Sequence, residues 1–159
     1  MRYRKKADKQ DALKHYQRAN TFMGQQRFKQ AAMEFDAAER FVSGFKDARY
    51  QAEYARSLVP PSHAQLQALV QRSVANGVPL SWLHDVHQGY SEHVVIHSIQ
   101  VLRQGRFNLH KEYWPYRLNV SGVTDLEVPN AEEQKITFTR VVDFRIFRDD
   151  FGGWKATFR

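Results

Sequence analysis

Four of the seven histidines fall close together near the middle of the chain, and they are the residues best suited to hold a metal ion. They are His84, His87, His93 and His97. Zinc is bound where three or four ligands converge at about 2.0–2.3 Å, and Asp85 or Glu92 could add an oxygen. The chain has no HExxH motif and no cysteine, so surface histidines remain the simpler interpretation. The sequence therefore predicts no metal and no other cofactor.

Residues suited to covalent or acid–base catalysis are present, but not in a recognisable arrangement. None of the serines lies in the G-x-S-x-G turn that exposes a nucleophile. Asp149 and Asp150 resemble a pair of acids, yet they precede Phe151, Gly152 and Gly153 and suit a turn. The glycine-rich motifs that bind nucleotide phosphates are absent. We expect a protein that is not an enzyme, and an enzyme with a dispersed site is the weakest of three alternatives.

Positive charge is concentrated at the beginning of the chain. The 24 Lys and Arg residues exceed the 17 Asp and Glu residues, and residues 1–58 hold 13 of the former and 7 of the latter. Such a cluster attracts phosphate groups, anionic lipids or an acidic protein surface, or simply keeps the chain soluble. The stretch at residues 110–117 places three aromatic residues beside basic ones, and it could stack on bases or bind a peptide. Alternatively, Trp114 and Tyr116 belong to the core, with Pro115 marking an edge strand. The possible nucleic-acid or anion contacts are Arg2, Arg4, Lys5, Lys6, Lys9, Tyr113 and Trp114.

Apolar residues recur every three or four positions through residues 12–58, which predicts three helices. Gly24, residues 43–44 and residues 60–61 mark where these helices end. The first two should pack antiparallel, because only a short turn joins them. Ser62 is suited to cap a fourth helix, and residues 81–86 would form a short fifth one.

The small and aromatic residues of the first two helices resemble a tetratricopeptide repeat over about residues 12–45. The matching positions are Ala19, Phe22, Phe28, Ala31, Phe35 and Ala38, whereas His15 replaces the usual tryptophan and Ser43 the usual proline. The resemblance implies a concave groove that binds a segment of another protein. The exposed residues expected beside that groove are Lys14, Arg18, Gln25, Arg27 and Lys29. Because one repeat cannot bury its own apolar face, it must pack on the rest of the chain, on a partner or on further repeats.

From Tyr90 onward the pattern becomes that of strands. Between residues 136 and 148 the apolar residues Ile136, Phe138, Val142, Phe144 and Ile146 alternate with Thr137, Thr139, Asp143 and Arg145. Helices followed by strands predict an α+β fold, with antiparallel helical hairpins before an antiparallel β-meander. The expected parts are a basic extension (1–10), a repeat-like helical region (11–58), a helical connector (59–89) and a sheet region (90–159).

These observations favour a non-catalytic scaffold that works inside a larger assembly of protein subunits. Chains that combine such hairpins with β-modules resemble bacterial envelope or secretion components. The alternative is a basic protein that binds RNA or the ribosome. No apolar run reaches the roughly 20 residues of a membrane span, and no secretory signal is visible. The sequence thus favours the cytoplasm, or the periplasm or envelope if a precursor carries a signal.

Overall fold

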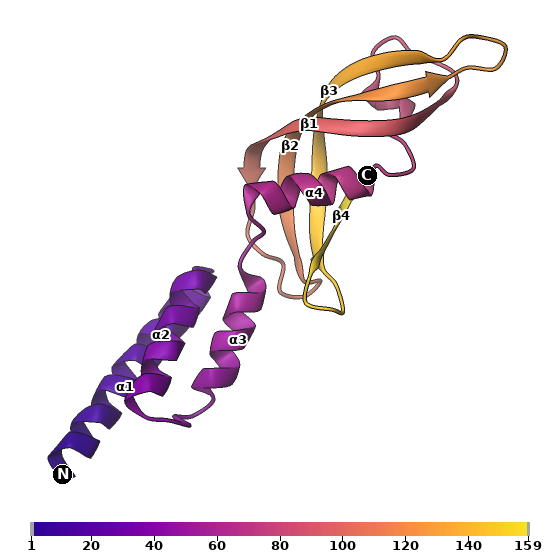
Figure 1. The fold of residues 1–159 in the computed structure, drawn as a ribbon. Helices are drawn as coiled ribbons and strands as arrows, with labels where there is room; N and C mark the ends of the chain where they lie inside the picture. Colours follow the sequence, from indigo (N-terminus) through magenta and orange to yellow (C-terminus); the bar gives the residue numbers. More distant parts are fainter. Residues whose placement is uncertain (1, 159) are drawn as a thin grey trace. The chain divides into compact units, whose positions relative to one another are not determined.

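The computed structural model describes residues 2–158, with side chains from Lys5 onward, and divides the chain into two compact units. The helical unit is Met1–Pro60 and the sheet unit is Pro61–Arg159. Helices come first and a four-stranded antiparallel meander follows, so the predicted α+β class is confirmed (Figure 1). Among the described residues, no helix is both long and apolar enough to cross a bilayer.

Three helices form the helical unit: α1 (Arg2–Gly24), α2 (Phe28–Phe41) and α3 (Ala48–Leu58). α1 begins well before the periodic residues that predicted it, because residues 2–11 contain good helix formers and neither glycine nor proline. The turn after Gly24 is closed by the Arg27 backbone N–H, which donates to the Phe22 carbonyl at 2.9 Å. The basic segment 1–10 is thus helical from Arg2 onward.

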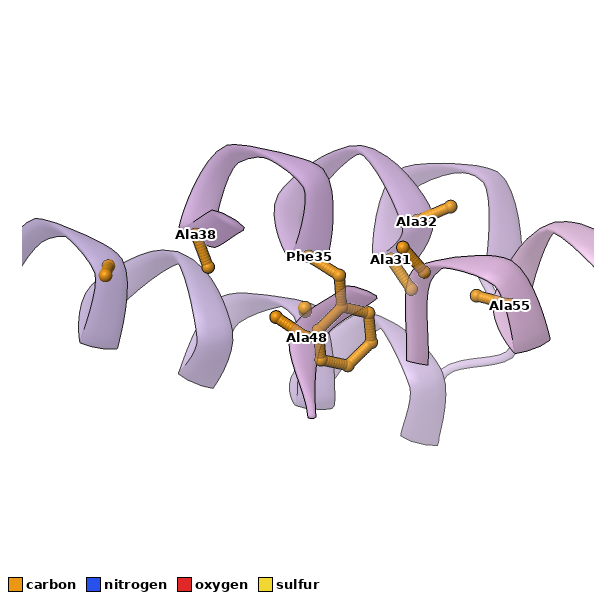
Figure 2. Close-up of a cluster of buried hydrophobic side chains, with 9 residues drawn as sticks. Ala31, Ala32, Phe35, Ala38, Ala48 and Ala55 are labelled. Carbon is orange, nitrogen blue, oxygen red and sulfur yellow. The ribbon is translucent and has the colours of Figure 1, made fainter. Parts of the chain in front are cut away.

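The core of the helical unit is built from alanines around one large ring (Figure 2). Phe35 of α2 is fully buried, and Tyr16 of α1 meets it edge-on with ring centroids 5.4 Å apart. The alanines allow the helix backbones to approach closely. They are Ala12, Ala19, Ala31, Ala32, Ala38, Ala48, Ala52 and Ala55, none more than 3% exposed. α3 therefore supplies the cover that the α1–α2 hairpin needs, and its outward residues Arg49, Glu53 and Arg56 are polar.

The sheet unit begins with α4 (His63–Ser73), which is held by the capping box that Ser62 predicted. The Gln65 backbone N–H donates to Ser62 Oγ at 3.2 Å, and the Ser62 N–H donates to Gln65 Oε1 at 2.9 Å. The expected connector thus contributes a helix to this unit, where α4 contacts β1 and β4. The predicted short helix is a single 3-10 turn, η1 (Leu80–Trp82).

The sheet has four strands in the order β1-β2-β3-β4: β1 (Tyr90–Gln104), β2 (Tyr113–Glu127), β3 (Gln134–Arg148) and β4 (Trp154–Phe158). β2 and β3 pair without interruption from Tyr113 opposite Phe147 to Leu126 opposite Gln134. β1 and β2 pair with three register shifts. β2 is therefore a central strand, and Pro115 does not mark an edge as predicted. It lies beyond the end of β1, so its missing N–H interrupts no bond to that strand.

The inner face of the sheet carries the predicted apolar side chains, and most of them are buried. Phe138, Val142, Phe144 and Ile146 of β3 are at most 5% exposed, and Leu118 and Val120 of β2 are fully buried. α4 adds Leu66, Leu69 and Val70 to this core. Trp82 of η1 closes it, with its ring 4.8 Å from the ring of Phe158. The alternation predicted for residues 136–148 is thus confirmed.

Two glutamines of α4 hydrogen-bond to the backbone of β1. Gln71 Nε2 donates to the Val94 carbonyl at 2.8 Å, while its Oε1 accepts from the Ile96 N–H at 2.8 Å. Gln67 Nε2 donates to the His97 carbonyl at 3.2 Å. A single side-chain amide therefore occupies the place that a neighbouring strand would take beside Val94 and Ile96.

Burial of Tyr116 in this core predicts an alkaline limit to the stability of the sheet unit. Tyr116 is 5% exposed, and burial raises the pKa of its hydroxyl to about 12. In the unfolded chain the tyrosine hydroxyl ionises near pH 10. Between about pH 10 and pH 12, Tyr116 therefore keeps its proton in the folded state and loses it in the unfolded state. The contribution of Tyr116 to the free energy of unfolding is complete below about pH 10. It falls as the pH rises towards 12, by at most about 1.4 kcal/mol per pH unit. Urea unfolding at several alkaline pH values should show this slope, and Tyr116→Phe should flatten it; an unchanged slope would contradict the prediction.

Candidate functional site

The predicted contact residues Lys14 and Arg18 lie one turn apart on α1, and Arg18 is tied to α2. Arg18 Nη1 lies 3.7 Å from Glu34 Oε1. Glu34 Oε2 also contacts His15 Nδ1 at 2.5 Å, and the His15 ring stacks on Phe41 with centroids 5.4 Å apart. Glu34 thus engages two side chains of α1, while Lys14 is exposed and has no ion pair among the described residues.

Gln25 and Arg27 lie in the turn between α1 and α2, Lys29 lies in the first turn of α2, and all three are exposed. Neither Arg27 nor Lys29 has an ion pair with a described residue. An α-helix rises about 1.5 Å per residue, so Gln25 lies about 10 Å beyond Arg18 along α1. The five predicted residues therefore form a strip that runs along α1 into the turn, and not a compact pocket.

The carboxylates of the helical unit are largely engaged within it. Asp36 accepts a hydrogen bond from Arg56 Nη1 at 2.7 Å. Asp47 accepts from the Tyr16 hydroxyl at 2.5 Å and from Gln51 Nε2 at 2.9 Å. The bond from Tyr16, followed by that from Gln51, lowers the pKa of Asp47, and the same contact raises the pKa of Tyr16. The excess of positive charge in the helical unit therefore rests on its composition, because residues 1–58 hold 13 Lys and Arg residues against 7 Asp and Glu residues.

The basic residues at the start of α1 extend this surplus of positive charge. Lys5, Lys6 and Lys9 are exposed and have no ion pair with a described residue. The side chains of Arg2 and Arg4 lie outside the described part of the chain. The helical unit therefore presents positive charge along α1 and at the α1–α2 turn.

The two aromatic residues predicted to contact nucleic acid point to opposite faces of the sheet. Trp114 is 4% exposed, with its ring 5.2 Å from that of Phe107, so it is not available to stack on a base. Neighbouring residues of a strand face opposite ways, which places Tyr113 on the outer face. There the guanidinium of Arg145 lies 4.9 Å from the Tyr113 ring centroid, and Phe147 lies 5.0 Å away. Of Tyr113 and Trp114, Tyr113 is the residue whose aromatic ring lies near solvent.

The outer face around Tyr113 holds Arg103 and Arg145, which the sequence interpretation missed, beside Arg117, which it included in the aromatic stretch. Arg103 and Arg117 are directly opposite in the β1–β2 register. Like charges in that position repel, and Asp143 offsets the repulsion by accepting from Arg117 Nε at 2.9 Å and from Nη2 at 3.3 Å. This pairing also lowers the pKa of Asp143. The alternation of residues 116–121 indicates that Arg117 faces outward, but not which charges lie beside it.

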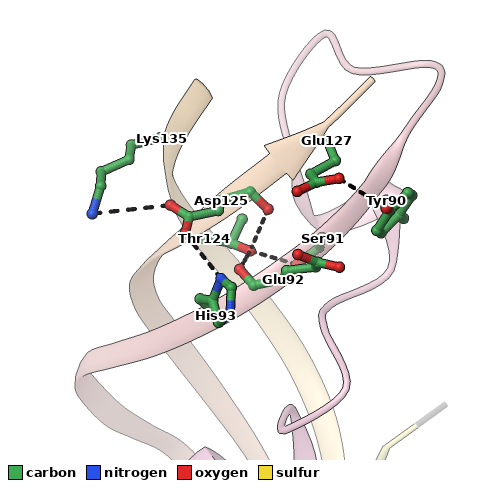
Figure 3. A network of polar contacts seen from close by, with 8 residues as sticks. All are labelled: Tyr90, Ser91, Glu92, His93, Thr124, Asp125, Glu127 and Lys135. Atoms are coloured by element: carbon green, nitrogen blue, oxygen red, sulfur yellow. Dashed lines mark hydrogen bonds and ion pairs between the residues drawn. The ribbon is translucent and has the colours of Figure 1, made fainter. Parts of the chain in front are cut away.

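The other end of the same strands is acidic (Figure 3). Asp125 Oδ2 lies 3.2 Å from His93 Nδ1, and Asp125 Oδ1 lies 3.9 Å from Lys135 Nζ. The charge of Asp125, more than that of Glu127, raises the pKa of Glu133. Charge on the sheet is thus separated, with arginines near the beginning of β2 and carboxylates near its end.

Buried hydroxyl groups beside this acidic end hold the strands together (Figure 3). Ser91 Oγ and Thr124 Oγ1 lie 2.5 Å apart, and the Val78 N–H donates to Ser91 Oγ at 3.0 Å. Gly77 fits beside this contact with a φ of +106°, and a Cβ there would lie 2.3 Å from the Ser91 carbonyl oxygen. These contacts attach the segment at Gly77 and Val78, which precedes η1, to β1. They indicate a structural role for Ser91.

The central histidines do not converge. His84 pairs with Asp85 at 3.1 Å, and both side chains are more than four-fifths exposed. Register shifts in β1 follow Glu92 and Ile96, so His93 and His97 sit at irregular positions of the strand. Within the part of the chain that the structure describes, no group of three or more His, Asp or Glu residues could hold a metal ion.

Comparison with protein-family models, with curated proteins and with solved structures finds no match to this chain.

Proposed function

We propose that the protein is a non-catalytic component of a larger protein assembly, and that its helical unit binds an acidic segment of a partner. The observation that carries this proposal is the charge of the α1–α2 hairpin. Lys14, Arg27 and Lys29 are exposed without ion pairs among the described residues, and residues 1–58 hold 13 Lys and Arg residues against 7 Asp and Glu residues. Unneutralised charge of one sign attracts a complementary surface and favours its orientation.

Apolar surface contributes less to this proposal than charge does. The alanine core of the hairpin is closed by α3 within the same chain, so no partner is needed to cover it. Among the larger apolar side chains of α2, Met33 is 63% exposed and Phe41 is 41% exposed. Scattered apolar residues of this kind are normal on a protein surface. The partner is therefore expected to be recognised through carboxylates.

Reversing charge on the strip should test this proposal. In Arg18→Glu/Arg27→Glu, we expect binding of the assembly partner to weaken by about tenfold or more, because two attractive contacts become repulsive. The partner would be identified first by cross-linking to the unaltered protein, and its affinity measured with purified components. Circular dichroism should show unchanged helix content, and Arg18→Gln removes charge without placing a second carboxylate beside Glu34.

Arg40→Glu/Arg49→Glu is the matched control, because it changes the net charge equally at exposed positions outside the strip. It should retain most of the binding. An equal loss in both double variants would indicate non-specific attraction, and no loss in the first would remove the strip from the binding surface.

The RNA-binding alternative is favoured by one observation, the outward-facing Tyr113 beneath Arg145 and near Arg117. Aromatic rings and arginines on an exposed sheet can stack on bases and contact phosphates. If RNA is the ligand, a single-stranded RNA probe should bind at low salt and lose affinity steeply as salt is added. Absence of binding at low salt would eliminate this alternative.

A further inference from the structure

A hollow of about 270 Å³ lies on the outer face of the sheet near the start of β2. Two small residues form its floor, Gly105 after β1 and Pro115 of β2. The Gly105 backbone N–H donates to the Pro115 carbonyl at 2.9 Å, and a Cβ at Gly105 would lie 2.8 Å from Pro115 Cγ. Glycine allows this close approach, and it leaves the space above the floor without a side chain from position 105.

Four long side chains surround this floor and line the hollow. Tyr113 and Arg117 lie two residues before and after Pro115, on the same face of β2. Arg103 of β1 is opposite Arg117 in the register. Arg145 of β3 is opposite Pro115. The strand register thus brings guanidinium groups from three strands around one depression.

The hollow is positively charged. Among the described residues, its lining holds three arginines and one carboxylate, Asp143, which gives a net charge of +2. Arg103 has no ion pair with any described residue. Asp143 accepts from Arg117 Nε at 2.9 Å and from Nη2 at 3.3 Å, which uses two of the five N–H donors of a guanidinium. Arg117 therefore keeps donors that no described residue accepts from.

The Tyr113 ring positions Arg145 at the rim of the hollow. The Arg145 guanidinium lies 4.9 Å from the centroid of the Tyr113 ring, and the Phe147 ring lies 5.0 Å from the same ring. The negative face of the ring attracts the cation, while its N–H groups stay able to donate. An arginine that is already oriented loses less conformational freedom when it binds an anion. Tyr113 thus serves here to hold a donor, and less of its ring is left for stacking on a base.

Charge farther along the same face opposes a long polyanion. Asp125 and Glu127 lie near the end of β2, and Glu92 of β1 is opposite Asp125 (Figure 3). Asp125 is eight residues beyond Arg117, which is about 26 Å along a strand. A nucleic-acid strand that follows β2 would therefore be attracted at one end and repelled at the other. A single phosphate group would contact the arginines alone.

We propose that the hollow between Arg103, Arg117 and Arg145 binds the phosphate group of a phosphorylated side chain in another protein. Such a group carries nearly two negative charges and three acceptor oxygens, which suits three guanidinium groups and a net charge of +2. Clusters of arginine are a general means of recognising phosphorylated segments, because the planar fork of donors matches phosphate oxygens.

A free phosphorylated metabolite is a poorer occupant than a phosphorylated segment. The hollow of about 270 Å³ is smaller than the roughly 300–1,000 Å³ of sites that enclose small ligands. A peptide gains additional contacts with the sheet around the hollow, which a small molecule does not reach. This proposal concerns the sheet unit and does not depend on the helical unit binding a partner.

Capped heptapeptides of glycine and alanine can test the proposal with the full chain. One peptide carries a central phosphoserine, a second a central glutamate, and a third a central serine. We expect the phosphoserine peptide to shift the amide NMR signals of Gly105 and Arg117 and the Nε–H signals of the three arginines. The glutamate peptide should bind about tenfold more weakly, because it brings one charge instead of two, and the serine peptide should not bind.

Inorganic phosphate and a single-stranded RNA distinguish the source of the phosphate group. At equal concentrations of phosphate groups, both should bind about tenfold more weakly than the phosphoserine peptide. Equal or tighter binding of inorganic phosphate would overturn the assignment to a protein side chain. Equal or tighter binding of the RNA would overturn it in favour of nucleic acid.

Two matched variants locate the binding to this hollow. Arg103→Gln should weaken binding of the phosphoserine peptide by about tenfold and leave the fold intact, because it also relieves the repulsion from Arg117. Arg140→Gln removes an exposed arginine of the same sheet that does not line the hollow, and it should retain binding. An equal loss in both variants, or no loss in Arg103→Gln, would contradict the proposal. Arg18→Glu/Arg27→Glu should leave peptide binding unchanged, which separates this result from the proposal for the helical unit.

Discussion

Replacing Phe35 with alanine is expected to unfold the helical unit and to leave the sheet unit folded. The Phe35 side chain is fully buried between helices, and removal of a buried phenylalanine side chain costs about 3–5 kcal/mol. The alanines around it, Ala31, Ala38 and Ala48, are too short to fill the cavity, and Tyr16 touches it from one side only, so we expect the cavity to be refilled only in part. A unit of this size has only a few kcal/mol of stability to lose. Urea unfolding followed by circular dichroism would measure the loss, and amide NMR spectra would show which unit remains folded.

Met33→Ala is the matched control on the same helix, because the Met33 side chain is 63% exposed. It should change the free energy of unfolding by less than about 0.5 kcal/mol. A cost below about 1 kcal/mol for Phe35→Ala would show that the helices close around the smaller side chain. The core of the helical unit would then be less rigid than the full burial of the Phe35 ring suggests.

Replacing Trp82 with alanine should destabilise the sheet unit by about 3–5 kcal/mol. Trp82 is 6% exposed, and its ring lies 4.8 Å from Phe158 and 6.0 Å from Phe138. It is held by a single 3-10 turn, and removal of the indole would leave a cavity beside these two rings. The measurement is urea unfolding followed by the amide signals of β3 and β4.

Phe151→Ala provides the comparison for Trp82, because Phe151 is 94% exposed in the turn before β4. Its removal should leave the midpoint of unfolding nearly unchanged. If Trp82→Ala were equally mild, η1 would be a peripheral turn that contributes little to the core of the sheet unit.

The parts of the fold that could be predicted are those in which local pattern and packing agree. The alternation from Phe138 to Ile146 identifies a strand with one buried face, because successive side chains of a strand point to opposite faces of the sheet. Ser62 with Gln65 three residues later identifies the start of α4 through hydrogen bonds that are local in sequence. In the same way, the alanine and phenylalanine spacing identifies the hairpin of the helical unit.

The parts that could not be predicted depend on contacts distant in sequence. The central position of Pro115 depends on β1 lying beside β2, which no local pattern reveals. Burial of Trp114 rather than Tyr113 depends on which face α4 covers. The local sequence does not show whether the rest of the chain, a partner or further repeats would cover the helical hairpin. The structure shows that α3 of the same chain covers it.

The candidate binding surfaces were only partly predictable for the same reason. The exposure of Lys14 follows from helical periodicity, whereas Arg27 is exposed because it lies in the turn before α2. The attachment of Arg18 to Glu34 requires α1 and α2 to be aligned in space.

The amide of Gln71 has a consequence for how this protein behaves at high concentration. The Gln71 amide occupies the backbone groups of Val94 and Ile96 that another strand would need, so pairing between copies of the sheet unit through this part of β1 is disfavoured.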